Sequence, residues 1–484
     1  MPFFLRRSTG AALLLLAGLS AACSSPPRAW HGEQDVWSAA TQPALGDGEP
    51  LVEPGPDADL DDLVAWAVAA SPRLRASSQR WRAALEHVVQ AGSLPDPRIT
   101  FGYFVEEVQT RTGPMQWRVG LSQPIPWLGE LDLADEAALA QSRAAGARFV
   151  QERLALEADV RDTWAELAWV DAAAAITASH RDLLISWEEV ARARYSTGLG
   201  SESDVIRAQV ELGTLDDRVR TLRDLRLPVA ARLNAALDRP AAAPLPVPQL
   251  DSASPLALDA EALRANLGSS SPELLALDHE VESKQAFLHL SETDAWPDAA
   301  VGVDFTRIGR GGDDAVALTA GFSLPIWRGR IRAGIARAEA ELMATRADRE
   351  AAQNRLASEL ELLLYHMRDA ERRVSLYRDS LLPKGQESVA AVTTAYQAGA
   401  AGFLDLVDAE RVLLEFQLAG VRAQADRDQA RAALLALTGA PGSHADGASD
   451  AGDTSAARAA SGADETSTTH DTDSTRTTST ETAP

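Results

Sequence analysis

The sequence predicts a mainly α-helical protein that carries a small amount of membrane-type β structure and is built from one unit present twice. Three observations lead to this fold class. Short motifs recur at an offset of 200 to 202 residues, each copy contains helical stretches of unusual length, and each copy contains one pair of alternating segments. Because ordered matches at a nearly constant offset rarely arise by chance, the 484 residues are interpreted as one duplicated unit.

The repeated motifs occur in the same order in both copies. The clearest pairs are Ser71-Pro72 with Ser271-Pro272, Gly120-x-Ser122-x-Pro124 with Gly321-x-Ser323-x-Pro325, and Tyr195-x-x-Gly198 with Tyr396-x-x-Gly399. The first unit is assigned to residues 59–239 and the second to residues 257–440. Between them, residues 240–256 are predicted to be a linker, because its prolines, among them Pro240, Pro244, Pro246 and Pro248, are incompatible with a helix interior.

Each copy is predicted to contain one very long helix and two shorter ones. In copy one the long helix covers residues 128–197, a stretch rich in Ala, Leu, Glu and Arg that contains no proline. At about 1.5 Å per residue its length would be on the order of 100 Å. The remaining helices are predicted at 59–91 and 203–237 in copy one, and at 263–293, 328–398 and 403–437 in copy two. The two shorter helices of a copy can stack end to end against its long helix.

The alternating segments lie between the first short helix and the long helix of each copy. Their apolar residues are Ile99, Phe101, Tyr103, Val105, Trp117, Val119 and Leu121 in copy one, and Val301, Val303, Phe305, Val316, Leu318, Ala320 and Phe322 in copy two. A period of two predicts a β-hairpin in each copy, with an apolar and a polar or small-residue face. Four strands cannot enclose a lumen, because the smallest membrane barrels use about eight, so several chains are expected to contribute to one barrel.

The N-terminus is predicted to be an export signal, residues 1–22. Arginines precede an apolar run at 11–19 that is too short to span a bilayer, and the only cysteine, Cys23, follows directly. Two processing routes remain open, ordinary cleavage at the small residues before Cys23 and lipidation of Cys23 itself. We prefer diacylation with palmitate-type chains, which would make residues 23–58 a lipid-anchored linker in contact with outer-membrane lipid.

The remaining composition excludes several classes of function. A net charge of −24 and a pI near 4.8 argue against a nucleic-acid partner, which needs a basic surface. The eight histidines show no metal-ligand spacing, and the sequence contains no phosphate-binding loop or nucleophile turn, so neither a metal site nor a cofactor nor an enzymatic activity is predicted. Residues 441–484 are predicted to be a disordered tail, because they lack the large apolar residues needed for a core.

Two groups of motifs carry a resemblance to a known family. The segments Gln123-Pro124-Ile125-Pro126-Trp127-x-Gly129 and Leu324-Pro325-Ile326-Trp327-Arg328-Gly329 resemble the strand-to-helix junctions of the TolC family of outer-membrane efflux proteins. The two Tyr-x-x-Gly turns resemble that family's helix-turn-helix tips. The resemblance covers residues 59–440, and Trp127 and Trp327 are the aromatic residues that we expect at the membrane interface.

The resemblance implies both an architecture and a function. The expected assembly is a homotrimer in which a twelve-stranded β-barrel is joined to an α-helical periplasmic barrel, located in the bacterial outer membrane and extending into the periplasm. The expected function is that of a passive conduit in a tripartite efflux or secretion system. Its expected partners are an inner-membrane pump and a periplasmic adaptor (membrane fusion) protein. The alternative is a lipid-anchored periplasmic helical adaptor or scaffold, which would not need two alternating hairpins.

The resemblance also implies a periplasmic gate. Asp405 and Asp408 are three residues apart on one helix face and match the paired aspartates that ring the closed entrance in the family. In a trimer they would supply six carboxylates that favour cations. Asp204 and Tyr396 resemble the family's latch, although Ala401 stands where the family pattern has an arginine. The competing interpretation is that the two aspartates serve only the helix start, where the helix dipole favours acidic residues.

Overall fold

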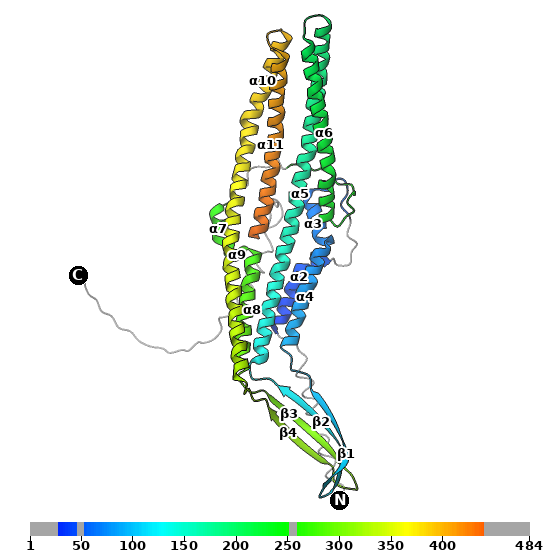
Figure 1. The fold of residues 1–484 in the computed structure, drawn as a ribbon, viewed down its shortest axis with the longest axis vertical. Coiled ribbons are helices and arrows are strands. Elements are labelled where there is room, and N and C mark those ends of the chain that lie inside the picture. The colour runs from blue at the N-terminus through cyan, green and yellow to red at the C-terminus, as the bar shows by residue number, and fades with distance from the viewer. Residues whose placement is uncertain (1–27, 46–52, 251–258, 440–484) are drawn as a thin grey trace, which may run out of the picture. The chain divides into compact units, whose positions relative to one another are not determined.

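The computed structural model of the chain describes residues 28–45, 53–250 and 259–439. The predicted signal peptide, Cys23 and the predicted tail lie outside these residues. Figure 1 shows helices that run beside one another and a sheet at one end. In chain order the elements are α2 (Arg28–Leu45), α3 (Leu60–Ala70), α4 (Pro72–Ala91), β1 (Arg98–Thr110), β2 (Gly113–Ile125), α5 (Glu130–Ser196), α6 (Glu202–Ala236), α7 (Ala260–Ser270), α8 (Pro272–Thr293), β3 (Ala299–Ile308), β4 (Ala315–Phe322), α9 (Arg328–Leu376), the π-helical turn η1 (Tyr377–Leu381), α10 (Leu382–Gln397) and α11 (Phe403–Thr438).

The same order of elements therefore occurs twice, and α5 joins the two copies. Helix α5 has 67 residues, which corresponds to roughly 100 Å at about 1.5 Å per residue. It packs against α4 and α6 of its own copy and against α8 and α11 of the other. Within the described chain no helix is both long enough and apolar enough to cross a membrane.

Each first short helix is divided in two, which corrects the single helices predicted at 59–91 and 263–293. The breaks fall at Ser71 and Ser271, whose backbones are extended (ψ 117° and 120°). Proline follows each serine, and a proline ring disfavours the helical conformation of the residue before it. The break is stabilised in copy one, because the Ser71 hydroxyl accepts a hydrogen bond from the backbone N–H of Leu74.

The long helix predicted at 328–398 is also interrupted, and the interruption is a π-helical turn. Five residues from Tyr377 to Leu381 adopt this geometry, and Pro383 follows after Leu382. Proline cannot donate the regular backbone hydrogen bond, and the wider turn accommodates that loss. The turn lies against Gly420 of α11, where a Cβ atom added to the glycine would meet Tyr377 Cβ at 3.4 Å. The equivalent helix of copy one, α5, is continuous.

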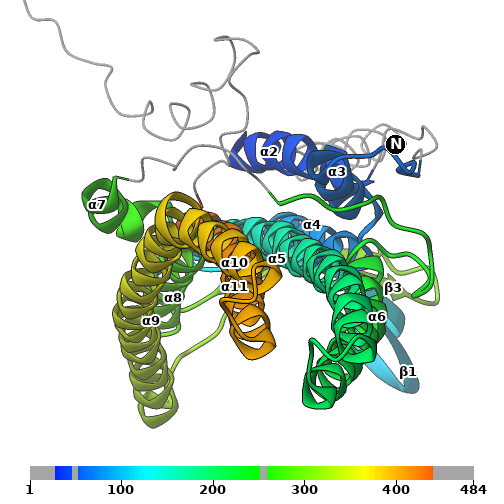
Figure 2. The same ribbon diagram turned by 90° about the horizontal axis from the view of Figure 1, so that it is seen from above.

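Residues 28–45 form a helix, α2, within the segment that the sequence suggested was a linker. Figure 2 shows α2 beside α4. The indole N–H of Trp30 donates to the Leu85 carbonyl at 3.1 Å, and that of Trp37 donates to the Ser78 carbonyl at 3.2 Å. Two tryptophan side chains thus fasten this helix to the first copy.

The four strands form one antiparallel sheet in the order β1-β2-β3-β4. Its register places Phe101, Val119, Phe305 and Val316 in one row across all four strands. The neighbouring row consists of Thr100, Gly120, Asp304 and Ala317 and belongs to the other face. The predicted separation into an apolar face and a polar or small-residue face is confirmed, and so is the mainly helical fold class with its two hairpins.

A close helix contact between α4 and α5 depends on a glycine. A Cβ atom on Gly146 would come within 2.8 Å of the Trp81 ring, which is buried against Phe149 at a centroid distance of 5.8 Å. Gly146→Ala should therefore lower the stability of the protein by about 1–3 kcal/mol because the core is overpacked.

A matched control is Gly32→Ala in α2, where an added Cβ meets nothing within 4 Å. Alanine has the higher helix propensity, so this substitution should leave the thermal unfolding midpoint unchanged or raise it slightly. Equal midpoints for the two variants, measured by circular dichroism in detergent, would contradict the packing described for Gly146.

Candidate functional site

The candidate site lies at the turns of two helical hairpins, α5–α6 and α10–α11, at the end of the helices remote from the sheet (Figure 1). Each turn contains a glycine in the left-handed region, Gly198 with φ 76° and Gly399 with φ 74°. The backbone N–H of Gly198 donates to the Tyr195 carbonyl and that of Gly399 to the Tyr396 carbonyl. The two Tyr-x-x-Gly motifs are thus the same turn, because only glycine adopts this backbone conformation at little cost.

Asp405 and Asp408 lie in the first two turns of α11, and their side chains have different surroundings. The Oδ2 atom of Asp405 accepts a hydrogen bond from the backbone N–H of Gly402 at 2.9 Å, so this carboxylate caps the helix start. Asp408 is exposed, and its Oδ1 atom is 3.8 Å from Nη1 of Arg411 on the next helical turn. The capping interpretation therefore has direct support for Asp405, while the Asp408 carboxylate faces solvent.

Tyr396 is buried, with 6% of its surface exposed, although it lies next to the turn. Its ring packs edge-on against Phe403 at a centroid distance of 5.8 Å. Burial raises the pKa of its hydroxyl, the nearby guanidinium of Arg194 opposes that shift, and the negative charge of Asp204 adds to it. The structure thus brings Asp204 and Tyr396 into one electrostatic environment, from α6 and α10 respectively.

Arg194 is the functional candidate that the sequence did not reveal. Its guanidinium carbon lies 4.8 Å from the centroid of the Tyr396 ring, and its Nη1 donates to the Tyr396 carbonyl at 2.9 Å. One cation therefore binds both the face and the backbone of a residue 202 positions away. The sequence signal that could have identified it is a difference between the two copies: Arg194 directly precedes Tyr195, whereas Ala395 precedes Tyr396. The family pattern has an arginine at position 401, where this chain has alanine. Here Arg194, from the other hairpin, supplies a cation beside Tyr396.

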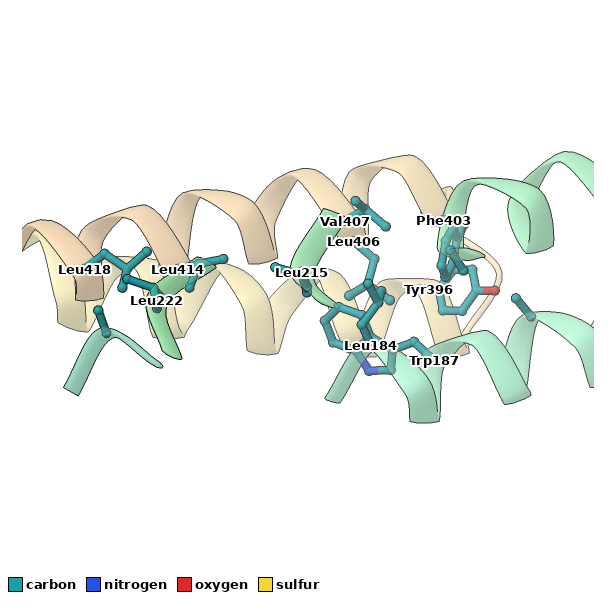
Figure 3. Close-up of a cluster of buried hydrophobic side chains, with 13 residues drawn as sticks. Leu184, Trp187, Leu215, Leu222, Tyr396, Phe403, Leu406, Val407, Leu414 and Leu418 are labelled. Atoms are coloured by element: carbon teal, nitrogen blue, oxygen red, sulfur yellow. The ribbon is translucent and has the colours of Figure 1, made fainter. Parts of the chain in front are cut away.

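Below the turns, the two hairpins share one apolar core (Figure 3). Its large members are Leu184, Trp187, Leu215, Leu222, Tyr396, Phe403, Leu406, Val407, Leu414 and Leu418. Polar pairs cross the same interface. Arg218 of α6 donates to Glu415 of α11 at 2.7 Å, and Arg411 of α11 pairs with Glu211 of α6. The candidate gate residues are thus attached to a packed interface between the copies.

The predicted strand-to-helix junctions have unequal geometry. Pro124 lies near the end of β2, and Gly129 starts α5 with φ 85°, so glycine is required there. The ring of Trp127 stacks on that of Trp296 at 5.1 Å and 10°. The backbone N–H of Trp127 donates to the Asp298 side chain at 3.3 Å, so the second copy holds the first junction in place. Trp296 was not identified from the sequence.

The second junction is more exposed and less constrained. Pro325 and Trp327 follow β4, and the Trp327 side chain is exposed at the start of α9. Gly329 lies inside α9 with room around it, so the backbone geometry there does not require glycine. The turn at the first junction therefore requires glycine at position 129, whereas the backbone at the second junction does not require glycine at position 329.

The polar side chains of the described residues form no metal site. No group of three or more His, Cys, Asp or Glu side chains in this part of the chain is arranged to hold a metal ion. The charged residues at the turns instead pair with one another or face solvent.

Comparison with solved structures identifies proteins of the same fold. The outer membrane protein VceC of Vibrio cholerae aligns with a TM-score of 0.66 at 20% identity, covering 78% of this chain and 96% of that protein. The outer membrane channel CmeC of Campylobacter jejuni aligns with a TM-score of 0.68 at 11% identity, covering 82% and 91%. These likenesses support the same arrangement of long helices and strands.

Sequence comparison identifies relatives as well. The cobalt-zinc-cadmium resistance protein CzcC of Cupriavidus metallidurans is 23% identical over 370 residues, which cover 74% of this chain and 84% of that protein. A family model described as outer membrane efflux protein matches residues 63–238 and again residues 263–440. Both matched segments contain a hairpin of the sheet and a helical hairpin that ends in a Tyr-x-x-Gly turn. This chain therefore belongs to the outer membrane efflux protein family.

Proposed function

We propose that the chain is the channel subunit of a tripartite export system, a homotrimeric passive conduit that catalyses no reaction. The observation that carries this proposal is the exposed apolar face of the sheet, where 76% of Ile99 and 87% of Leu318 are accessible in the single chain. Such a face is unfavourable in water and suits lipid. The outer strands, β1 and β4, suit pairing with neighbouring copies, which would close a twelve-stranded barrel.

The same observation disfavours the alternative of a helical adaptor or scaffold. An adaptor would use the helical hairpins but would have no need for a four-stranded sheet with one lipid-compatible face. The hairpin turns are the part of the chain that suits docking to a periplasmic adaptor, since Leu199 and Leu404 beside the two turns are exposed. The inner-membrane pump would then act through that adaptor.

Helix α2 supports the proposal of a lipid anchor at Cys23. The helix begins at Arg28, five residues after Cys23, and Trp30 is held by Leu85 near the end of α4 from which the chain enters β1. Five extended residues span at most about 18 Å. An acylated Cys23 would therefore be tethered close to the strand end of the helices, where a membrane anchor is useful.

We further propose that the hairpin turns form the gate. Asp405 and Asp408 would place six carboxylates near the axis of a trimer and would favour cationic cargo. Arg194, by binding the ring and the carbonyl of Tyr396, would hold the two hairpins of one chain together in the closed state, with Asp204 adding to the local field. The name of the C. metallidurans relative makes divalent cations a suitable test cargo.

The first experiment tests the channel itself. Full-length protein extracted from outer membranes should migrate as a trimer, conduct ions in planar bilayers and carry acyl chains on Cys23 detectable by mass spectrometry. Cys23→Ser should lose the acyl chains but remain trimeric, because the sheet holds it in the membrane independently. A non-conducting monomer in the soluble fraction would refute the proposal.

The second experiment tests the carboxylate ring. Asp405→Asn combined with Asp408→Asn should reduce the permeability ratio of Zn²⁺ to chloride, measured from reversal potentials, by about two- to tenfold. Asparagine removes the charge but keeps an oxygen that accepts the Gly402 N–H, so the helix cap survives. Glu282→Gln with Glu292→Gln on α8 removes the same charge from exposed positions and should leave the ratio unchanged. Unchanged selectivity in the aspartate variant would exclude a role of these residues in selectivity and leave only their role at the helix start.

The third experiment tests the Arg194 contact. Arg194→Gln should raise basal conductance by about two- to tenfold, since a cation–π contact contributes about 0.5–2 kcal/mol and the bond to the Tyr396 carbonyl is lost with it. Tyr396→Leu should act in the same direction. Arg372→Gln, an exposed arginine of α9 whose partner Asp369 keeps its contact with Arg373, is the control and should conduct normally. Equal conductance for all variants would exclude Arg194 from the gate.

A further inference from the structure

A buried histidine joins the two helical hairpins below their turns. His180 of α5 and Glu410 of α11 are 5% and 6% exposed, and the ring Nδ1 lies 2.6 Å from the Glu410 Oε1 atom. On the other side of the ring, Nε2 lies 2.8 Å from Oε1 of Gln417, two turns further along α11. The contact of Nε2 with Gln417 is a hydrogen bond, whereas Nδ1 and the Glu410 Oε1 atom are at ion-pair distance without hydrogen-bond alignment. A buried carboxylate at this distance from the ring suits the imidazolium form, because the positive charge offsets the cost of burying the negative one.

The carboxylate of Glu410 depends on that positive charge. It is buried within the apolar core that the hairpins share, and His180 is the cation recorded beside it in the described part of the chain. A buried carboxylate without a cationic partner is strongly unfavourable. Burial lowers the pKa of His180, but its contacts with Glu410 and Gln417 and the Glu410 charge outweigh burial, so the pKa is raised above its usual value of 6.5.

The other charged groups of this interface are already paired. The pairs recorded along this interface on α5, α6 and α11 join arginines to carboxylates, and α10 contributes apolar side chains to the core. These groups are Arg181 with Asp216, Arg218 with Glu415, Arg411 with Glu211, Glu188 with Arg192 and Gln209, and the apolar Val389 and Val392. Arginine keeps its charge at all physiological pH values, whereas histidine changes charge near neutrality. His180 is thus the group of this interface whose charge responds to the pH of the periplasm.

We propose that the His180–Glu410 pair is a proton-dependent tie that holds the α10–α11 hairpin against the α5–α6 hairpin. Below the usual histidine pKa, about 6.5, the tie is complete. As pH rises through the raised pKa of His180, the ring loses its charge, Glu410 is left as an uncompensated buried carboxylate, and the contact between the hairpins weakens. In the channel proposed above, alkaline conditions would then favour opening and acidic conditions would favour closure.

The first test measures the histidine directly and needs no channel activity. In full-length protein labelled with ¹³C and ¹⁵N histidine, the His180 signals are identified by their loss in His180→Gln. The ring should remain doubly protonated above about pH 6.5. Glu410→Gln should lower the pH at which the ring titrates, because only the Gln417 contact then opposes the effect of burial. A neutral His180 ring at pH 6, or a titration that Glu410→Gln does not change, would overturn the proposal.

The second test measures basal conductance in planar bilayers and rests on the proposed channel function. Between about pH 6 and 8.5 the unaltered protein should show a rise of about threefold that is absent from both His180→Gln and Glu410→Gln. His279→Gln, which alters a histidine paired with Glu282 on α8, should keep the original profile. The same pH profile in all four proteins would overturn the tie. If none conducts at any pH, the channel function fails, and the labelled-histidine experiment still decides the tie.

Should His180→Gln fail to assemble, Glu410→Gln suffices for both tests. It keeps the shape of the side chain, and the histidine signal that it shifts is then the one assigned to His180. A double variant, His180→Gln with Glu410→Gln, removes both charges together and should assemble better than His180→Gln alone, because no carboxylate is left buried without a partner. Equal assembly of the single and double variants would contradict the pairing.

Discussion

The packing of α5 against α11 is the interaction on which the rest of the structure depends. Helix α5 belongs to the first copy and α11 to the second, so this contact, together with those of α5 with α8 and of β2 with β3, joins the two repeated units into one body. It is built from apolar side chains along both helices, among them Leu184 and Leu414. Both hairpin turns, and therefore the candidate gate residues on them, are positioned by it. A change in that packing would move the turns, whereas a change in a turn would leave the packing largely intact.

The polar groups within this interface have a different role from the apolar ones. Apolar burial provides most of the attraction but does not define the register of two long helices, because leucines tolerate small shifts. Charged and hydrogen-bonded pairs do so, since a shifted pair leaves an unsatisfied group in a poorly solvated place. The contacts from Arg194 to Tyr396, from Arg411 to Glu211 and from His180 to Glu410 lie along the two hairpins. They favour one register of the two hairpins.

The two copies differ in several local features. Helix α5 is continuous, while its counterpart contains the π-helical turn at Tyr377–Leu381 beside Gly420. Within the described residues, the added helix α2 accompanies the first copy, held by Trp30 and Trp37. At the membrane end, Trp127 of the first copy stacks on Trp296 of the second, so the two hairpins of the sheet are joined at their base. The duplication thus accounts for the order of elements that the two copies share, and these local differences make the two copies structurally unequal.

The sequence by itself determined the features that depend on neighbouring residues. The long helix at 128–197, the two alternating hairpins and the two glycine turns follow from composition, periodicity and the spacing of glycines, and the structure has all of them. The second long helix, predicted at 328–398, is present but is interrupted at Tyr377–Leu381. Even the breaks at Ser71 and Ser271 were within reach, because a proline follows each serine. Helix α2 was missed, since its docking depends on two tryptophans that contact carbonyl groups on a different helix. Only the tertiary structure decided that Arg194 lies on Tyr396 and that His180 meets Glu410. These partners are more than 200 residues apart in the chain, and they meet only because two long helices pack in one particular register.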